Sequence, residues 1–179
     1  MKRMPKTIGE AAPKPAAGRP VVAVLDTVLA SSEAALKGGV WQSPTERIVY
    51  WAGVKLDDVW LVTTVIRPNA VLQRGSFRTS AADNAKVVSY LSQAGLSLAG
   101  QVHTHPGPFV DHSHGDERDA FMPVENSLSL VVPFYGRGGM TPLTNCGVHR
   151  YESGAYRRLS GAEITGTFCV VSSMADLAK

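Results

Sequence analysis

The sequence contains little cysteine and no long hydrophobic run. Its two cysteines, Cys146 and Cys169, lie 23 positions apart, so the sequence predicts neither a Cys-x-x-Cys zinc knuckle nor a disulfide framework. No apolar stretch approaches the length of a transmembrane helix. The apolar run from residue 21 to residue 30 begins late and is interrupted by Asp26, unlike the core of a secretion signal. These absences predict a cytoplasmic protein with no membrane partner.

Charge of one sign is also scarce outside the first twenty residues. The chain has a net charge of +3, and residues 1–20 hold five Lys or Arg and one Glu, an excess of +4 that leaves −1 for residues 21–179. A nearly neutral folded part gives no reason to expect a nucleic-acid partner. The basic, Ala- and Pro-rich residues 1–20 lack an apolar face, so we expect a disordered N-terminal arm or one that docks on an acidic partner.

A chain of 179 residues is long enough for one domain with an adequate core. We expect this domain at residues 21–160, with residues 161–179 as its C-terminal extension. Apolar periodicity and turn residues predict strands at 21–25, 46–53, 59–66, 101–105, 127–132, 147–152 and 155–159, and helices at 27–37, 81–94 and 116–121.

The remaining segments have weaker patterns. Residues 67–79 should be irregular, residues 135–141 should form a mobile turn or flap, and residues 168–171 should form a strand or a docking tail. Strands interspersed with helices in this way predict an α/β fold in two or three layers. We expect a curved, mostly antiparallel mixed sheet that is flanked by helices.

The residues that carry chemistry are concentrated between positions 100 and 119. A short strand there places His103 and His105 two residues apart on one face, so that both imidazoles can share one ion. Pro106 ends the strand, and after a loop Asp116 opens a predicted helix. A catalytic zinc site uses three protein ligands and leaves one position open for water. His103, His105 and Asp116 satisfy that count.

Other residues of the stretch are weaker candidates. His112 and His114 are the alternative ligands, since His-rich tracts can bind metal by composition alone, but their loop fixes neither ring. Asp111 and Asp119 are expected to be a solvated loop residue and a helix-surface residue. Asp116 could also cap its helix, a role that is compatible with metal binding.

The spacing of these residues resembles the signature of the JAMM (MPN+/JAB domain) metallo-isopeptidases. That signature reads His-x-His, seven residues, Ser, two residues, Asp, and the chain matches it without a gap. The resemblance covers residues 21–160 and implies that His103, His105 and Asp116 hold Zn²⁺ while Ser113 lies beside the zinc-bound water. It also implies a JAB/MPN fold, which is cytidine deaminase-like, although the deaminase motif itself is absent.

The family also uses a glutamate on an earlier strand. The resemblance implies that this residue is Glu46, with Glu33 as the alternative inside a predicted helix. Because an amine leaves only once it is protonated, such a carboxylate carries the proton from the zinc-activated water to the leaving nitrogen. Ser113 would donate a hydrogen bond to the oxyanion of the tetrahedral intermediate.

The resemblance implies a stand-alone prokaryotic zinc metalloprotease of the deubiquitinase-like type. Its expected substrates are isopeptide or peptide bonds at the C-terminus of a ubiquitin-like protein, cleaved in deconjugation or precursor processing. Expected partners are that protein or its conjugates, and possible activating or conjugating enzymes of the same operon. The flexible tail should lie in a groove near residues 67–79 and 135–141. The alternatives are a zinc hydrolase of sulfur-carrier proteins or small peptides and an inactive scaffold of the same fold.

Overall fold

The computed structural model describes residues 21–37 and 43–173. The expected N-terminal arm, residues 1–20, and the last part of the expected C-terminal extension, residues 174–179, lie outside the described residues. Among the described residues, no helix is both long enough and apolar enough to cross a membrane.

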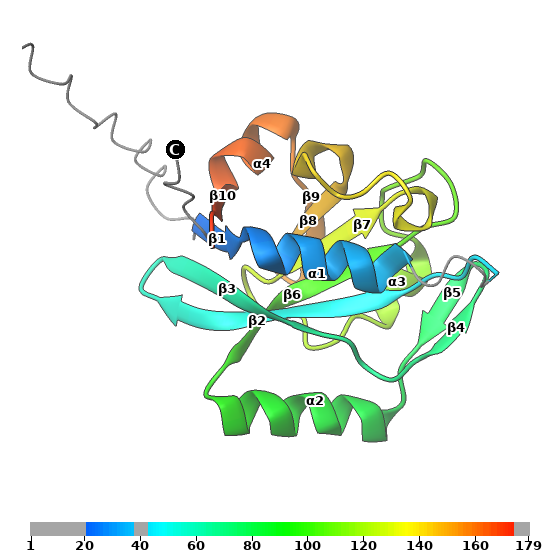
Figure 1. The fold of residues 1–179 in the computed structure, drawn as a ribbon, viewed down its shortest axis with the longest axis horizontal. Coiled ribbons are helices and arrows are strands. Elements are labelled where there is room, and N and C mark those ends of the chain that lie inside the picture. Colours follow the sequence, from blue (N-terminus) through cyan, green and yellow to red (C-terminus); the bar gives the residue numbers. More distant parts are fainter. Residues whose placement is uncertain (1–20, 38–42, 174–179) are drawn as a thin grey trace, which may run out of the picture.

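A strongly curled eight-stranded sheet forms the centre of the molecule (Figure 1). Its strands follow the spatial order β10-β1-β3-β2-β6-β7-β8-β9. Four neighbouring pairs are antiparallel and three are parallel, which confirms the predicted mixed, mostly antiparallel sheet. The strands are β1 (Val21–Leu25), β2 (Ile48–Leu56), β3 (Val59–Ile66), β6 (Ser97–Thr104), β7 (Leu128–Val132), β8 (Gly147–Glu152), β9 (Ala155–Arg158) and β10 (Phe168–Val171).

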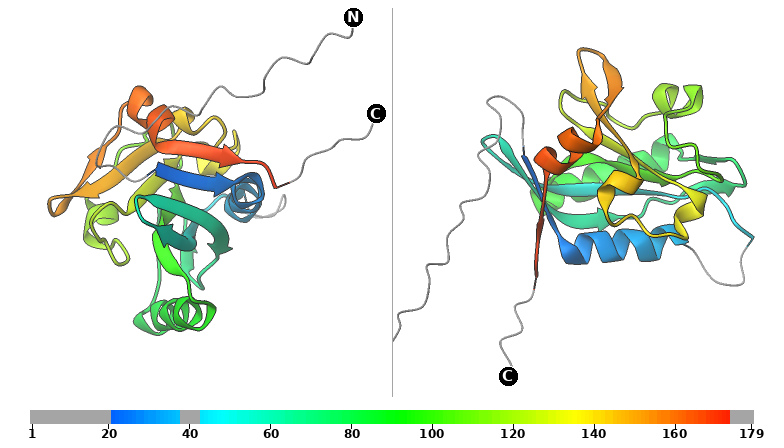
Figure 2. Two further views of the ribbon diagram at one scale, coloured as in Figure 1. Left: turned by 90° about the vertical axis from the view of Figure 1, so that its left-hand side faces the viewer. Right: turned by 90° about the horizontal axis from the view of Figure 1, so that it is seen from above.

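Helices cover both faces of this sheet. Figure 2 shows α1 (Asp26–Lys37) and α4 (Gly161–Thr167) on one side and α2 (Ala81–Ala94) on the other. The alternation along β2 explains this, because Val49 and Trp51 pack in the cluster of α1 while Tyr50 and Ala52 pack in that of α2. Each large side chain that is buried in this way contributes about 1.5–3 kcal/mol. The chain therefore has three layers, one of the two arrangements expected.

Helix α2 begins and ends where its sequence predicts. The hydroxyl of Ser80 accepts a hydrogen bond from the backbone N–H of Asp83 at 3.1 Å, and Gly95 ends the helix in the left-handed conformation with φ of 64°. Val87 and Leu91 are buried against the sheet. Helix α2 thus closes the second face of the sheet.

The sequence predicted that residues 67–79 are irregular. This prediction was wrong, because the segment contains a short hairpin. Its strands are β4 (Val71–Gln73) and β5 (Ser76–Arg78), which pair only with each other in the described part of the chain. Strands of three residues are too short to show an alternating apolar pattern, and tertiary contacts hold them. The hydroxyl of Tyr135 donates to the carbonyl of Arg74 in the turn at 2.8 Å, and the N–H of Glu46 donates to the carbonyl of Gln73 at 2.8 Å.

The glycine-rich residues 135–141 pack against α1 and do not form a flap. Met140 is fully buried, and its N–H donates to the carboxylate of Glu33 at 2.8 Å. The predicted turn is therefore present but packs on a helix, because Gly136 and Gly139 allow a close approach of the chain to Leu36 and Glu33. At the C-terminal end, β10 pairs in parallel with β1, so the strand alternative for residues 168–171 is correct.

Candidate metal centre

Strand β6 places the two histidines of the motif on the α2 face of the sheet. His103 pairs in register with Ile48 of the α2 cluster, whereas its neighbour Val102 belongs to the α1 cluster. His105 is the first residue after the strand, and its N–H donates to the carbonyl of Val132 at 2.9 Å. Backbone hydrogen bonds at the end of β6, a central strand of the sheet, therefore hold both histidines.

The third residue, Asp116, is presented by the short helix α3 (His114–Arg118). Ser113 caps this helix, and the two residues form a capping box. The N–H of Ser113 donates to Asp116 Oδ2 at 2.6 Å, and the N–H of Asp116 donates to Ser113 Oγ at 3.3 Å. Asp116 thus lies at the third helical position and does not open the helix. Its carboxylate is fixed by the same hydrogen bonds that begin α3.

The ligand atoms of the three residues converge. Nε2 of His103 lies 3.3 Å from Nε2 of His105, and each nitrogen lies 3.2 Å from an oxygen of Asp116. A tetrahedral zinc ion with bonds of about 2.0–2.1 Å requires its ligand atoms to be about 3.3 Å apart. His105 Nδ1 donates to the carbonyl of Phe109 at 3.0 Å, which leaves Nε2 available to an ion. The residues present therefore fit zinc.

The electrostatics of the group favour a cation. Burial disfavours the charged form of Asp116, but hydrogen bonds from His103 and His105 outweigh it and hold the pKa of this carboxylate well below its usual range. Burial likewise opposes protonation of His105, yet its contact with Asp116 raises the pKa of the imidazole. The carboxylate thus favours positive charge at the position where a metal cation would bind.

Glu46 lies in the same site, and Glu33 does not. Glu46 is two residues before β2, and its side chain is only 6% exposed. Burial raises its pKa to about 7; His105 acts against this rise, and the Asp116 carboxylate adds to it. Glu33 on α1 is bound to Met140 and to Lys37. The structure therefore brings only the first of the two candidate proton carriers to the metal-binding group.

A pocket of about 640 Å³ opens over this group. Three elements border it: the β4–β5 hairpin, the loop of residues 106–109 and α3, all at one end of the sheet (Figure 1). Glu46, His105, Ser113 and Asp116 line it. The ring of Phe77 lies 5.5 Å from that of His103. The pocket is bordered by residues 67–79, as expected for the groove, but not by residues 135–141.

The alternative ligands lie elsewhere. Neither His112 nor His114 belongs to the converging group. His114 is exposed on α3, and the half-buried His112 ring stacks on His149 with centroids 4.0 Å apart. Burial, together with the neighbouring histidines, lowers the pKa of His112 to about 3. This ring is therefore a neutral packing element.

The two remaining aspartates have different outcomes. Asp119 is exposed at the C-terminal end of α3, in keeping with the expected surface position, and it also pairs with Arg118. Asp111 is not simply solvated, because it binds Arg158 at 2.8 Å and lies 3.5 Å from His149. Sequence reasoning missed these partners, because His149 and Arg158 lie on strands that are distant from Asp111 in the sequence.

The chain is similar to a protease relative and to several solved structures. No family model matches it. It is 32% identical to the probable metalloprotease y4jG of Sinorhizobium fredii over 106 residues, which are 55% of this chain and 62% of that protein. It therefore spans less than two thirds of that relative's length. This similarity bears out the resemblance that the motif carries.

The chain is also similar to two solved structures, to different extents. Protein DSY2949 from Desulfitobacterium hafniense has a TM-score of 0.62 at 15% identity, over 86% of this chain and 95% of that one. A JAB1/MPN domain protein from Archaeoglobus fulgidus has a TM-score of 0.43 at 16% identity, over 81% and 97% of the two chains. The α/β fold, with a curled mixed sheet between helices, is thus one that the chain shares with DSY2949.

Proposed function

We propose that this chain is a zinc-dependent hydrolase that cleaves the isopeptide or peptide bond after the C-terminal tail of a ubiquitin-like protein. One observation carries the proposal: the ligand atoms of His103, His105 and Asp116 converge at zinc spacing beside the buried carboxyl of Glu46. The 32% identity to a probable metalloprotease supports the same reaction class. All four motif positions are intact, which argues against an inactive scaffold.

Each residue of the pocket has a chemical role in this reaction. His103, His105 and Asp116 would hold the zinc ion, which would supply the Lewis acidity that activates water near neutral pH. Glu46 takes the proton of the attacking water and passes it to the leaving nitrogen, a task that suits a carboxyl with a pKa near 7. The exposed hydroxyl of Ser113 donates to the oxyanion that develops on the scissile carbonyl, while its lone pair caps α3.

The β4–β5 hairpin supports an extended substrate. Strand β5 lines the pocket and pairs only with β4 among the described residues, so its other edge can add one more strand. A flexible tail that pairs along this edge would run over the metal-binding group, with its side chains in the pocket. Hence a ubiquitin-like protein or its conjugate is the proposed substrate, and the enzymes that attach such a modifier are proposed further partners.

The proposal is tested with a substrate panel. Zinc-loaded protein is incubated with ubiquitin-like fusions that carry either a linear extension or an isopeptide-linked lysine after the tail, and the products are identified by mass spectrometry. We expect cleavage directly after the tail, loss of cleavage after chelation, and recovery on adding zinc. Failure to cut any fusion, or cleavage that persists in chelator, would contradict the proposal.

A second candidate, release of an amino acid or short peptide from a sulfur-carrier-like protein, is favoured by Arg78. The side chain of this exposed residue lines the pocket and makes no hydrogen bond or ion pair with another described side chain, although its charge helps to lower the pKa of the Asp119 carboxyl. Arg118 of the same pocket is instead held by Asp119 at 2.8 Å. A free guanidinium binds a carboxylate well. Carrier fusions that end in a free carboxylate should then be cut faster than the matching amides, and Arg78→Gln should abolish the preference.

A further inference from the structure

One row of side chains crosses β6 to β9 at a single register on the face of the metal centre. Gln101 pairs with Ser129, Ser129 with His149, and His149 with Arg158. The first three are buried polar residues in a sheet whose other positions are mostly apolar. Gln101 donates to the hydroxyl of Ser129 at 3.2 Å. The row thus forms a continuous polar strip that can make hydrogen bonds and ion pairs with a segment packed on this face.

The loop that joins β6 to α3 packs on this strip. Nε2 of His112 lies 2.9 Å from the hydroxyl of Ser129, and its ring stacks on His149. The two carboxylate oxygens of Asp111 lie 2.8 Å from Arg158 and 3.5 Å from His149. Two consecutive loop residues are therefore held by side chains of three different strands.

Gly147 also contacts the loop. We call Gly147, His149 and Arg158, the residues that hold the loop in place, the seat of the loop. Gly147 lies two positions before His149 on β8, and the carbonyl oxygen of Val110 rests directly on it. A Cβ at Gly147 would lie 1.7 Å from that oxygen, so a larger residue must displace the loop. Contacts with Gly147, His149 and Arg158 thus hold the three consecutive loop residues 110–112 in place.

The seated segment leads straight to the metal centre. Ser113 follows His112, and its N–H makes the 2.6 Å hydrogen bond to Asp116 Oδ2 that aims this carboxylate at the two histidines. A shift of the loop by a fraction of an ångström would be transmitted to the ligand, because only one residue separates the Asp111 anchor from the Ser113 amide.

We propose that Gly147, His149 and Arg158 are positioning residues that set the affinity of the centre for zinc by seating residues 110–112. They contact none of the three ligands, and act through the backbone of Ser113. The proposal rests on the zinc site of the proposed function but not on its substrate, since zinc affinity can be measured with no substrate present. A chain that binds zinc and cleaves nothing would leave it standing.

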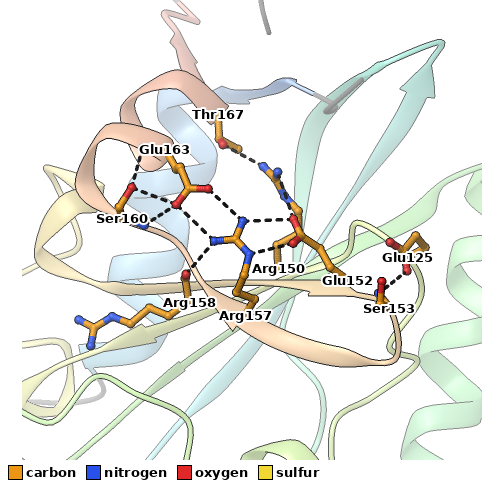
Figure 3. A network of polar contacts seen from close by, with 9 residues as sticks. All are labelled: Glu125, Arg150, Glu152, Ser153, Arg157, Arg158, Ser160, Glu163 and Thr167. Carbon is orange, nitrogen blue, oxygen red and sulfur yellow. Dashed lines mark hydrogen bonds and ion pairs between the residues drawn. The ribbon is translucent and has the colours of Figure 1, made fainter. Parts of the chain in front are cut away.

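Neighbouring arginines of β9 give a matched test. Figure 3 shows the side chain of Arg158 turned away from the cluster in which Arg157 binds Glu152, Glu163 and the backbone carbonyl of Arg158. Zinc affinity is measured by competition with a chromophoric chelator, and the melting temperature of the metal-free protein is measured separately. Arg158→Gln should weaken zinc binding by about tenfold with little change in melting temperature, because its ion pair with Asp111 is about half exposed. Arg157→Gln should lower the melting temperature and leave zinc affinity unchanged.

Two further variants separate positioning from general packing. Gly147→Ala should weaken zinc binding more, by about 10–100-fold, and should change the absorption spectrum of the cobalt-substituted protein, which reports ligand geometry. Arg158→Lys keeps the charge and should restore most of the affinity lost in Arg158→Gln. Wild-type zinc affinity and an unchanged cobalt spectrum in both Gly147→Ala and Arg158→Gln would overturn the proposal, as would a wild-type chain that binds no zinc.

Discussion

Glu46 is 6% exposed and lies in the same pocket as the Asp116 carboxylate, which makes it the residue on which proton transfer should depend. Glu46→Gln keeps the size of the side chain but removes the proton carrier. We expect zinc content to be unchanged and kcat to fall by about 10²–10⁴. Glu33→Gln is the matched control, because Glu33 lies outside the pocket and an amide oxygen still accepts from Met140. Equal turnover of Glu46→Gln and wild type would assign the proton transfer to another group.

Because Glu46 is buried, the free energy of unfolding should depend on pH. The pKa of Glu46 is raised from 4.5 to about 7 by burial. A raised pKa means that the folded chain holds this proton more tightly, so the stabilisation is complete below about 4.5 and is lost as the pH rises through 7. The shift corresponds to about 3 kcal/mol. Metal-free Glu46→Gln should therefore be more stable than wild type at pH 8.5 but not at pH 4.5, in urea titrations. A pH-independent difference would contradict this.

The histidines test the ligand set itself. Removing either His103 or His105 leaves two protein ligands, too few for an open catalytic site. We expect His103→Ala and His105→Ala each to lose zinc and hydrolysis together, as measured by metal analysis of the purified protein. His112→Ala and His114→Ala are the controls and should keep a full zinc ion. Full occupancy in the His103/His105 double variant would transfer the ligand role to the control residues.

At the scale of elements, α3 has two functions at its first turn. Five residues cannot form a stable helix alone, so the cap by Ser113 and the ligand Asp116 depend on each other. Ser113→Ala removes both the cap and the hydroxyl donor, whereas glycine retains most of the capping stability. We expect both variants to lose about 10²–10³ in kcat, with only Ser113→Ala destabilised by about 1 kcal/mol. A rate restored in Ser113→Gly would show that the cap alone matters.

The sequence predicts the long elements of this fold well and the short ones poorly. Residues 21–25, 59–66 and 81–94 have the predicted bounds, because each buries one regular face against the sheet or ends in residues such as Ser80 and Gly95. The hairpin at residues 71–78 was missed because contacts from distant residues hold it. Helix α4 was also missed, since its seven residues carry only one apolar position that is deeply buried, Ile164.

In the candidate site, too, the sequence predicts local features and misses contacts between distant residues. The spacing of His103, His105, Ser113 and Asp116 predicts which residues can meet, because a strand and a capped helix fix them locally. The seat of the loop could not be predicted, because Asp111 meets Arg158 across 47 positions of sequence. Only the completed sheet brings β7, β8 and β9 under that loop.

At the scale of the whole molecule, the sheet separates the metal-binding residues on one face from the main hydrophobic core on the other. The metal centre lies on the α2 face, whereas Ile164 of α4 is 5% exposed in the core of the α1 face. Ile164→Ala should cost about 2–5 kcal/mol of unfolding free energy and Ile164→Val about 0.5–1.5 kcal/mol, because a cavity remains where the side chain was. Neither change should alter the zinc affinity of the folded protein, since no side chain of the seat or the ligand set packs on that face. Urea unfolding of the metal-free chain and chelator competition at low denaturant measure the two quantities independently. A loss of zinc affinity that grows in step with the loss of stability would show that the two faces are coupled through the sheet.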